Sequence, residues 1–187
     1  MAKGGIISAI HQGSLAEELE LVPGDKIISI NEQELTDIID LSFALADEEI
    51  EMLIEHENGE QEIIAFEKDI DEELGAEFES AVFGKIRQCA NNCYFCFVDQ
   101  VAPNMRDSLY IKDDDYRLSF LYGNFVTMTN MGPRDLERIH RLHLSPLYIS
   151  VHTTNPKLRG EMLRTKRGEL IMEQLAKLNE ADVEYHT

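Results

Sequence analysis

The feature that most constrains this chain is a set of three cysteines within eight residues. Cys89, Cys93 and Cys96 are the only cysteines among the 187 residues, and they lie in the segment QCANNCYFCF with C-x3-C-x2-C spacing. An odd number of cysteines cannot pair completely in disulfides, and no secretory signal indicates an oxidising compartment. The pattern therefore predicts a metal centre held by thiolates on one loop.

Two kinds of metal centre fit these thiolates. A zinc ion could bind Cys93 and Cys96 and complete its tetrahedral ligand set with His140 or His143. A structural zinc site normally takes two short ligand pairs from separate segments, and the chain has no second cysteine pair. Three thiolates on one loop suit a 4Fe-4S cluster, in which each sulfur binds one iron and the fourth iron accepts another ligand. The spacing therefore favours the cluster.

The cysteine motif, with Phe95 before its last cysteine, resembles the signature of the radical S-adenosylmethionine enzymes. The segments KDDDYRLSFLYGNFVTMTN and SPLYISVHTTNPKLRGEML are similar to the second and third strand units of that superfamily's barrel. Together with a PDZ-like N-terminus, nearly the whole chain resembles a bacterial family of PDZ plus radical-SAM, Fe-S oxidoreductase-like proteins. The chain looks like the N-terminal portion of that family, which continues into a C-terminal domain of unknown function.

This resemblance implies an enzyme that generates a radical. Cys89, Cys93 and Cys96 would hold a 4Fe-4S cluster, and S-adenosylmethionine would bind its open iron. Reduction by an electron donor such as a ferredoxin or flavodoxin would yield a 5′-deoxyadenosyl radical, which abstracts hydrogen from an unknown substrate. The sequence assigns no further catalytic residue.

Several side chains are candidates for binding the cofactor. The resemblance places Phe95 near the adenine, and packing beneath the loop is a compatible role. The superfamily usually has a Gly-Gly-Glu element after its second strand, but here Thr129, Asn130 and Met131 occupy that place. Thr127, Thr129 and Asn130 could supply oxygen acceptors instead, although threonine in a strand needs no reason beyond β propensity.

Two further groups lie near the expected strand ends. Ser150 and His152 are one residue apart on the third strand and so share a face. The resemblance suggests ribose or carboxylate contacts for Ser150, and His152 is either a cofactor contact or a structural histidine. Asp113, Asp114 and Asp115 fit a divalent cation or, more simply, a solvated helix start.

The charge is divided unevenly along the chain. Residues 1–80 contain 23 acidic and 3 basic side chains, whereas residues 81–187 contain 13 and 14. This asymmetry predicts two units, and the negative field of the first argues against nucleic acid binding there. The acidic excess also serves solubility. No apolar run approaches the roughly 20 residues of a membrane span, so the sequence predicts a cytoplasmic protein with no membrane partner.

Residues 1–68 are predicted to form a small PDZ-like, β-rich domain. A β-branched run at GGIISAI, the segment GSLA followed by PGDKIISIN, and a hairpin around Asn58 and Gly59 support this interpretation. PDZ domains bind an extended peptide at a sheet edge. In the bacterial arrangement the carboxylate-binding loop precedes the first strand, where this chain has three residues, so a peptide and an intramolecular partner are both open.

The remaining residues are predicted to form an acidic connector, 69–80, and the first part of a partial (β/α)6 TIM-like barrel, 81–187. The expected strands are AVFGKIRQ, which leads into the cysteine loop, then NFVTMTN, PLYISVH and VEYHT. The expected helices begin near Pro133, after Asn155, and along ELIMEQLAKLNEA, where Leu170, Ile171, Leu175 and Leu178 would form one apolar face. Because a barrel of this superfamily usually has six strands, we expect a truncated barrel with open edges.

Three functions follow from these patterns. The first is a radical S-adenosylmethionine enzyme. The second is an iron-sulfur electron carrier or scaffold that does not cleave the cofactor, which the missing Gly-Gly-Glu element suggests. The third is a PDZ-type adaptor that binds peptides while the cluster is structural.

Overall fold

The computed structural model describes residues 4–187, and these form a mixed α/β protein, as the sequence predicts. The chain divides into two compact units, Met1–Lys85 and Ile86–Thr187. Within the described residues, no helix has the length and apolar character needed to cross a membrane.

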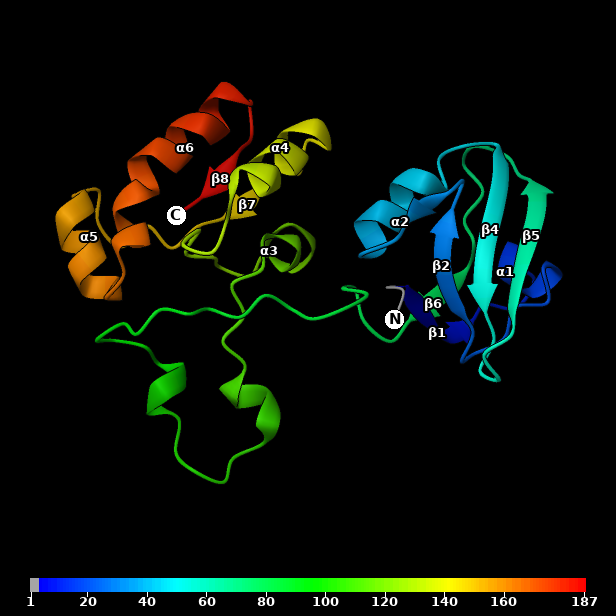
Figure 1. The fold of residues 1–187 in the computed structure, drawn as a ribbon, viewed down its shortest axis with the longest axis horizontal. Helices are drawn as coiled ribbons and strands as arrows, with labels where there is room; N and C mark the ends of the chain where they lie inside the picture. The colour runs from blue at the N-terminus through cyan, green and yellow to red at the C-terminus, as the bar shows by residue number, and fades with distance from the viewer. Residues whose placement is uncertain (1–3) are drawn as a thin grey trace. The chain divides into compact units, whose positions relative to one another are not determined.

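The N-terminal unit is built on an antiparallel sheet with strand order β5-β4-β2-β1-β6, and β3 pairs with β2 (Figure 1). The predicted hairpin is confirmed, because β4 and β5 pair in register on either side of Asn58 and Gly59. Gly59 has φ +85°, a left-handed conformation that glycine adopts without strain. The strands are β1 Gly5–Ile10, β2 Lys26–Ile30, β3 Gln33–Glu34, β4 Glu49–Glu55, β5 Gln61–Glu67 and β6 Ala76–Phe78.

Two short helices accompany this sheet, α1 Leu15–Glu18 and α2 Ile38–Ala44. Ser14 and Asp37 cap their N-termini by accepting backbone N–H bonds. Alternate strand residues and the inner helix faces form one apolar core. Its fully buried members include Ile7, Ala16, Ile27, Ile30, Leu35, Met52 and Ile54.

The segment predicted as a connector belongs to this unit. Strand β6 pairs antiparallel with β1, and Val82 forms a bridge with Asp37. Phe83 is buried in the core and its ring lies 5.4 Å from that of Phe78. The segment AVFGKIRQ is therefore not a barrel strand, since its apolar residues complete the N-terminal core. The division between the units comes at residue 85 rather than at residue 80.

The C-terminal unit consists of helices around short parallel strands. β7 pairs parallel with β8, and Val126 forms a parallel bridge with Ile149. These three adjacent extended segments correspond to the expected second, third and fourth strands, although each is short. The elements are η1 Val98–Gln100, η2 Asp107–Tyr110, α3 Tyr116–Tyr122, α4 Pro133–Arg141, β7 Leu147–Tyr148, α5 Pro156–Leu163, η3 Lys166–Leu170, α6 Ile171–Glu180 and β8 Tyr185–His186.

The helix starts in this unit follow the sequence signals. Pro133 is the first residue of α4, and Asn155 caps α5 by accepting the Leu158 N–H at 3.1 Å. The predicted apolar face of α6 is buried at Ile171, Leu175 and Leu178. Leu170 was expected on that face, but it lies in η3, before α6 begins, and is exposed.

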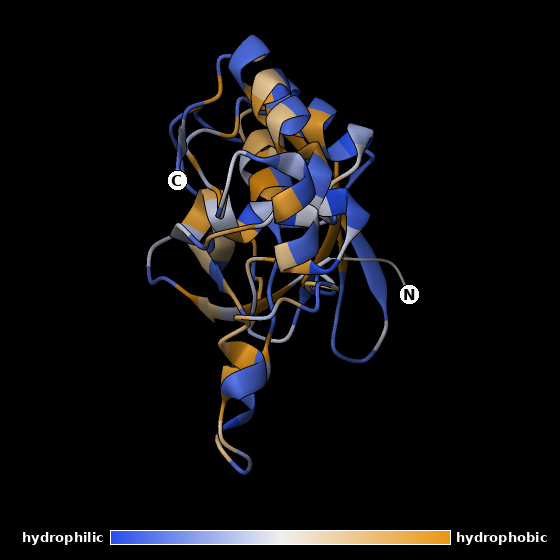
Figure 2. Ribbon diagram, turned by 90° about the vertical axis from the view of Figure 1, so that its left-hand side faces the viewer, coloured by the Kyte–Doolittle hydropathy of each residue, from blue (hydrophilic) through white to orange (hydrophobic). Residues whose placement is uncertain are grey.

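A long loop with two 3-10 turns, residues 89–112, projects from the C-terminal unit (Figure 1, green). Figure 2 shows hydrophobic and hydrophilic residues mixed along this projecting arm. Tyr94 and Phe97 expose 74% and 80% of their surface. The cysteine motif thus lies on a surface loop rather than within a regular element.

Candidate functional site

The three cysteines lie together at the start of this loop. All are free thiols and each is half-buried. Burial raises the pKa of Cys89, and the nearby Cys93 and Cys96 add to that rise. The Cys89 N–H donates to the Lys112 carbonyl at 2.7 Å, so the start of the loop is fastened to its end.

The arrangement of donors tests which metal centre fits. Within residues 4–187, no three Cys, His, Asp or Glu side chains converge as ligands of a single ion. His140 and His143, the candidates for a zinc site, are exposed on and just after α4. A 4Fe-4S cluster has a different requirement, because each thiolate binds a separate iron. Three neighbouring free thiols on one surface loop fit that requirement.

Asn91, inside the cysteine motif, ties the loop to the end of the second strand segment. Its amide donates to Thr127 Oγ1 at 3.1 Å and accepts from Thr129 Oγ1 at 3.0 Å. The two threonine hydroxyls are 2.9 Å apart. The structure therefore places Thr127 and Thr129 beside the cysteine loop, and their hydroxyls hold that loop in position.

Asp114 belongs to the same hydrogen-bond network. Its carboxylate accepts from the Thr127 N–H and from Thr127 Oγ1, the latter at 2.8 Å. Burial raises the pKa of this carboxyl. The two hydrogen bonds from Thr127 lower the pKa, but burial has the larger effect. Because Asp114 is 1% exposed, it is a structural acceptor rather than part of a solvated cluster.

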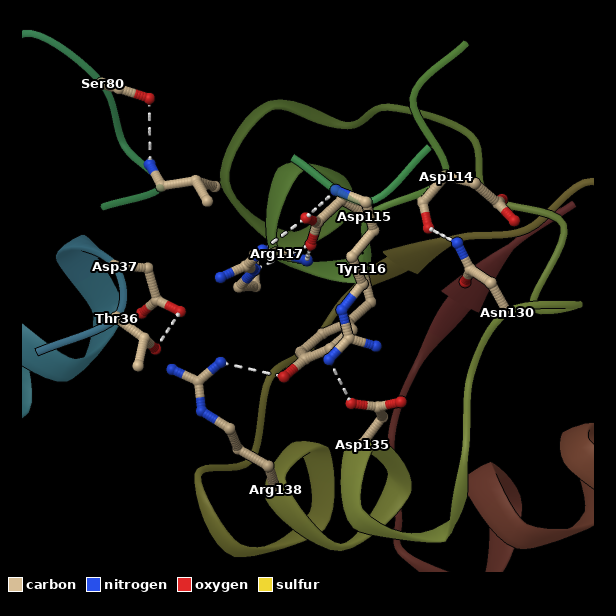
Figure 3. Close-up of polar contacts among 12 residues, drawn as sticks. Thr36, Asp37, Ser80, Asp114, Asp115, Tyr116, Arg117, Asn130, Asp135 and Arg138 are labelled. Atoms are coloured by element: carbon tan, nitrogen blue, oxygen red, sulfur yellow. Dashed lines mark hydrogen bonds and ion pairs between the residues drawn. The ribbon is translucent and has the colours of Figure 1, made fainter. Parts of the chain in front are cut away.

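The neighbouring aspartates also have partners within the protein. The expected helix start is present, because Asp115 caps α3, but Asp114 and Asp115 are buried rather than solvated. Asp115 caps α3 and is fully buried, and its carboxylate binds the Arg117 guanidinium, as Figure 3 shows. Burial raises the pKa of Asp115, but the bonds from Arg117 and from the Arg87 N–H outweigh it and leave the pKa lowered. Asp113 accepts from the Asn124 amide at 2.8 Å.

Arg159 binds the strand ends from within the unit. It is fully buried, and its guanidinium donates to four backbone carbonyls at 2.8–2.9 Å. These carbonyls belong to Thr127, Ser150, Val151 and Gly168. One planar cation thus joins the second and third strand segments to η3, replacing the longer strand ladder that the unit lacks.

Phe95 and His152 are brought together, with ring centroids 5.1 Å apart. His152 has φ +63°, a left-handed conformation that ends the extended run after Ile149. Burial and the charge of Arg159 lower the pKa of His152. Ser150 is half-buried, and its carbonyl is one of the acceptors of Arg159.

Asn130 has an unused acceptor. Its Nδ2 donates to the Asp114 carbonyl at 2.8 Å, a bond drawn in Figure 3. Its Oδ1 is buried and has no hydrogen-bond partner within the described residues. A buried amide oxygen without a donor is uncommon in native proteins, and such an oxygen is suited to accept a bond from a water, ion or ligand.

The comparisons with known proteins agree with this geometry. A family model described as a Radical SAM-like domain matches residues 68–187. The chain belongs to the radical SAM-like family. A model described as a PDZ domain matches residues 6–56, so the expected PDZ plus radical-SAM architecture is confirmed. No curated protein matches the chain.

Sequence reasoning missed several residues of this radical SAM-like site. Asn91, Asp114 and Arg159 make its main polar contacts, but none was singled out for that role. Asn91 could have been noticed, since it lies between two cysteines of the motif. Arg159 carried no local signal, because its four acceptors come from three separate segments.

Proposed function

We propose that this protein is a radical S-adenosylmethionine enzyme in which Cys89, Cys93 and Cys96 hold a 4Fe-4S cluster. The observation that carries the proposal is the set of three neighbouring free thiols, fixed by Asn91 to the strand end of a radical SAM-like domain. When bound, the cluster and S-adenosylmethionine supply a 5′-deoxyadenosyl radical for hydrogen abstraction.

The protein's own residues position and shield this site. Thr127 and Thr129 hold the cysteine loop through Asn91, and Arg159 keeps the strand ends together beneath it. The rings of Phe95 and His152 lie 5.1 Å apart with an interplanar angle of 49°, and together they offer an aromatic surface for contact with a planar base. Ser150, at the end of the third strand segment, is available to contact the ribose or carboxylate.

Met131 stands at the acidic position of the Gly-Gly-Glu element, and the neighbouring Asn130 is the residue of this segment with an unused acceptor. Its buried Oδ1 lacks a donor, and the methionine ammonium group of the cofactor is a strong donor. Binding would satisfy this oxygen. Thr127 and Thr129 already use their hydroxyls within the protein, so they serve the cofactor by positioning the loop.

The test is anaerobic reconstitution of the full chain with iron and sulfide, followed by EPR of the reduced protein with and without S-adenosylmethionine. A 4Fe-4S signal that changes when the cofactor is added supports the proposal. The triple variant C89A/C93A/C96A should bind no cluster. A cluster whose spectrum ignores the cofactor would favour the electron carrier instead.

Asn130→Ala examines the binding role separately. The variant should assemble the same amount of cluster but need at least about tenfold more S-adenosylmethionine for the spectral change, since a lost charge-assisted bond costs about 1.5–3 kcal/mol. Asn179→Ala, at an exposed position on α6, is the matched control. Equal affinities in both variants would remove Asn130 from the cofactor site.

A second activity, peptide binding, is favoured by strand β6. Strand β6 lies at the edge of the sheet, where β1 is its neighbour on one side and its other side is unpaired within the described residues. Among the described residues, the N–H groups of Glu73, Leu74 and Gly75, just before β6, make no hydrogen bond. Gly75 has φ +72°. Consecutive free N–H groups before an edge strand suit a peptide carboxylate, so we propose that this segment, which follows β5, does the work of the carboxylate-binding loop expected before the first strand.

The acidic surface of the unit predicts which peptides bind. Peptides with basic residues before an apolar carboxyl-terminal residue should be preferred. Fluorescence titration with such a peptide and with its carboxyl-terminal amide tests the site. Binding of the free acid that is lost with the amide supports peptide capture; no binding, or equal binding of both, contradicts it.

A further inference from the structure

A pair of opposite charges closes the cysteine loop. Lys112 Nζ lies 2.5 Å from Asp99 Oδ1. Asp99 is in η1, three residues after Cys96, whereas the Lys112 carbonyl accepts the N–H of Cys89. Lys112 therefore fastens both the start and the end of the cysteine motif, one through its backbone and the other through its side chain.

Both charges are held near the thiols by the chain, since the Lys112 carbonyl accepts the Cys89 N–H at 2.7 Å and Asp99 follows Cys96 by three residues. The pKa of Lys112 is raised mainly by its bond to Asp99, and the charges of Cys96 and Cys89 add to the rise. The pKa of Asp99 is lowered mainly by the same bond and also by a hydrogen bond with Cys96. The loop thus places one cation and one anion within electrostatic reach of the proposed ligands.

The other cation that acts on these thiols is differently placed. Arg159 interacts with Cys93, but its guanidinium is buried and bound to four carbonyls. Its bonds hold the backbone in place. Lys112 has a flexible stem, and its side chain is 26% exposed. Lys112 can therefore adjust to a change of charge at the thiols.

We propose that Lys112 and Asp99 set the reduction potential of the cluster, Lys112 by raising it and Asp99 by lowering it. The inference rests on the proposed function, because it requires a cluster on the three cysteines. Reduction transfers one electron from an external donor and adds one negative charge to the cluster and its thiolates. A neighbouring ammonium stabilises this more negative state, and a neighbouring carboxylate destabilises it.

The exposure of the pair gives the effect a salt dependence. The side chains of Lys112 and Asp99 are 26% and 46% exposed, so ions can screen their charges. Screening shortens the reach of such charges to about 3 Å at 1 M salt. The influence of the pair on the potential should therefore shrink as salt is raised.

The experiment is an EPR-monitored redox titration of the anaerobically reconstituted full chain. We expect Lys112→Met to shift the midpoint potential to a more negative value and Asp99→Asn to shift it to a more positive one. Lys112→Arg should stay near the wild-type value. Lys177→Met is the matched control, because Lys177 is exposed on α6 and pairs there with Glu173.

The opposite signs separate electrostatics from damage to the loop. Both Lys112→Met and Asp99→Asn break the same ion pair, so a merely structural pair predicts shifts of the same sign or equal loss of iron. That result, or unchanged potentials in both variants, overturns the inference. If Lys112→Met loses its iron, the Asp99→Asn variant tests the inference alone: a more positive midpoint potential supports it, and a more negative one overturns it. A wild-type chain that assembles no cluster would instead contradict the proposed function.

Discussion

The two units bury polar groups for different purposes. In the N-terminal unit the buried carboxylates act mainly on residues near them in sequence: Asp37 caps α2, and Asp25 accepts the N–H of Val22, three residues away. Asp25 also binds the ring of His56, 31 residues away. In the C-terminal unit the buried polar groups join distant segments. Asn91 meets Thr129, 38 residues away, and the guanidinium of Arg159 reaches Thr127, 32 residues away.

This difference shows how each unit is held together. The N-terminal unit has long paired strands and a continuous apolar core, so most of its buried carboxylate bonds finish helix and strand ends, and the Asp25–His56 bond is an addition to that core. The strands β7 and β8 of the C-terminal unit have two residues each. Hydrogen bonds from side chains to backbone carbonyls therefore join the segments that a longer ladder of backbone hydrogen bonds would otherwise hold. An apolar core loses stability in proportion to lost contacts, whereas a polar network fails when one member leaves its partners unpaired.

Arg159→Met should have the largest effect on stability. The substitution leaves four carbonyls without their donor, one at a buried bond and three at part-buried bonds, and an unpaired buried group costs about 1–3 kcal/mol, so we expect a loss of about 4 kcal/mol. Hydrogen exchange followed by mass spectrometry should show loss of protection across residues 86–187 but not in β4 and β5. Arg159→Lys should not restore protection, because one ammonium cannot bind four carbonyls. If residues 86–187 of Arg159→Met kept their protection from hydrogen exchange, the bonds from Arg159 to the four carbonyls would not be needed for stability.

Met52→Ala tests the apolar core in the same way. Met52 is fully buried on β4, and truncation there should cost about 3 kcal/mol. Chemical denaturation followed by exchange protection in β4 and β5 measures the loss. Phe43→Ala, at a residue that is 50% exposed, should cost less than about 1 kcal/mol. Similar losses in the two variants would contradict a core centred on the sheet.

Asn155→Ala should have a smaller effect, confined to the C-terminal unit. Loss of the cap of α5 should cost about 1 kcal/mol. The end of this helix accepts the N–H groups of Asn92 and Tyr94 from the cysteine loop, so alkylation of the thiols should also become faster. Asn155→Asp, which retains a capping oxygen, should behave like the wild type. An unchanged alkylation rate in Asn155→Ala would show that α5 does not restrain the loop.

The smallest effect concerns the pH dependence of the N-terminal unit. Hydrogen bonds to Asp25 and Glu62 raise the pKa of His56. A raised folded-state pKa contributes stability that is complete below the unfolded value of about 6.5 and is lost as pH rises through the folded value. Melting temperatures measured from about pH 6 to pH 8 should therefore fall in the wild type more than in His56→Gln. Parallel curves would exclude His56 as the source.

Much of the fold could be predicted because it depends on neighbours in sequence. The β4–β5 hairpin follows from alternating side chains around Asn58 and Gly59, and the start of α4 follows from Pro133. Strand β6 could not be predicted in the same way. Its three residues lie in an acidic segment, and only the edge of β1 makes them a strand.

The candidate site also has one part that the sequence predicts and another that depends on distant contacts. The cysteine spacing by itself predicts three thiolates on one loop, since the ligands are close in sequence. The partners of that loop cannot be predicted so simply. Asn91 and Lys112 acquire their roles from bonds to residues that approach only in the folded chain.

The sequence by itself determined the set of three cysteines on which the proposed centre rests, the acidic character of the N-terminal unit and the starts of the helices. Each of these depends on residue type and short spacing. The tertiary structure decided where the N-terminal unit ends, that Arg159 joins the strand ends, and which charges lie beside the thiols. These features depend on contacts between distant segments, because burial and the approach of opposite charges are fixed only when the chain is packed.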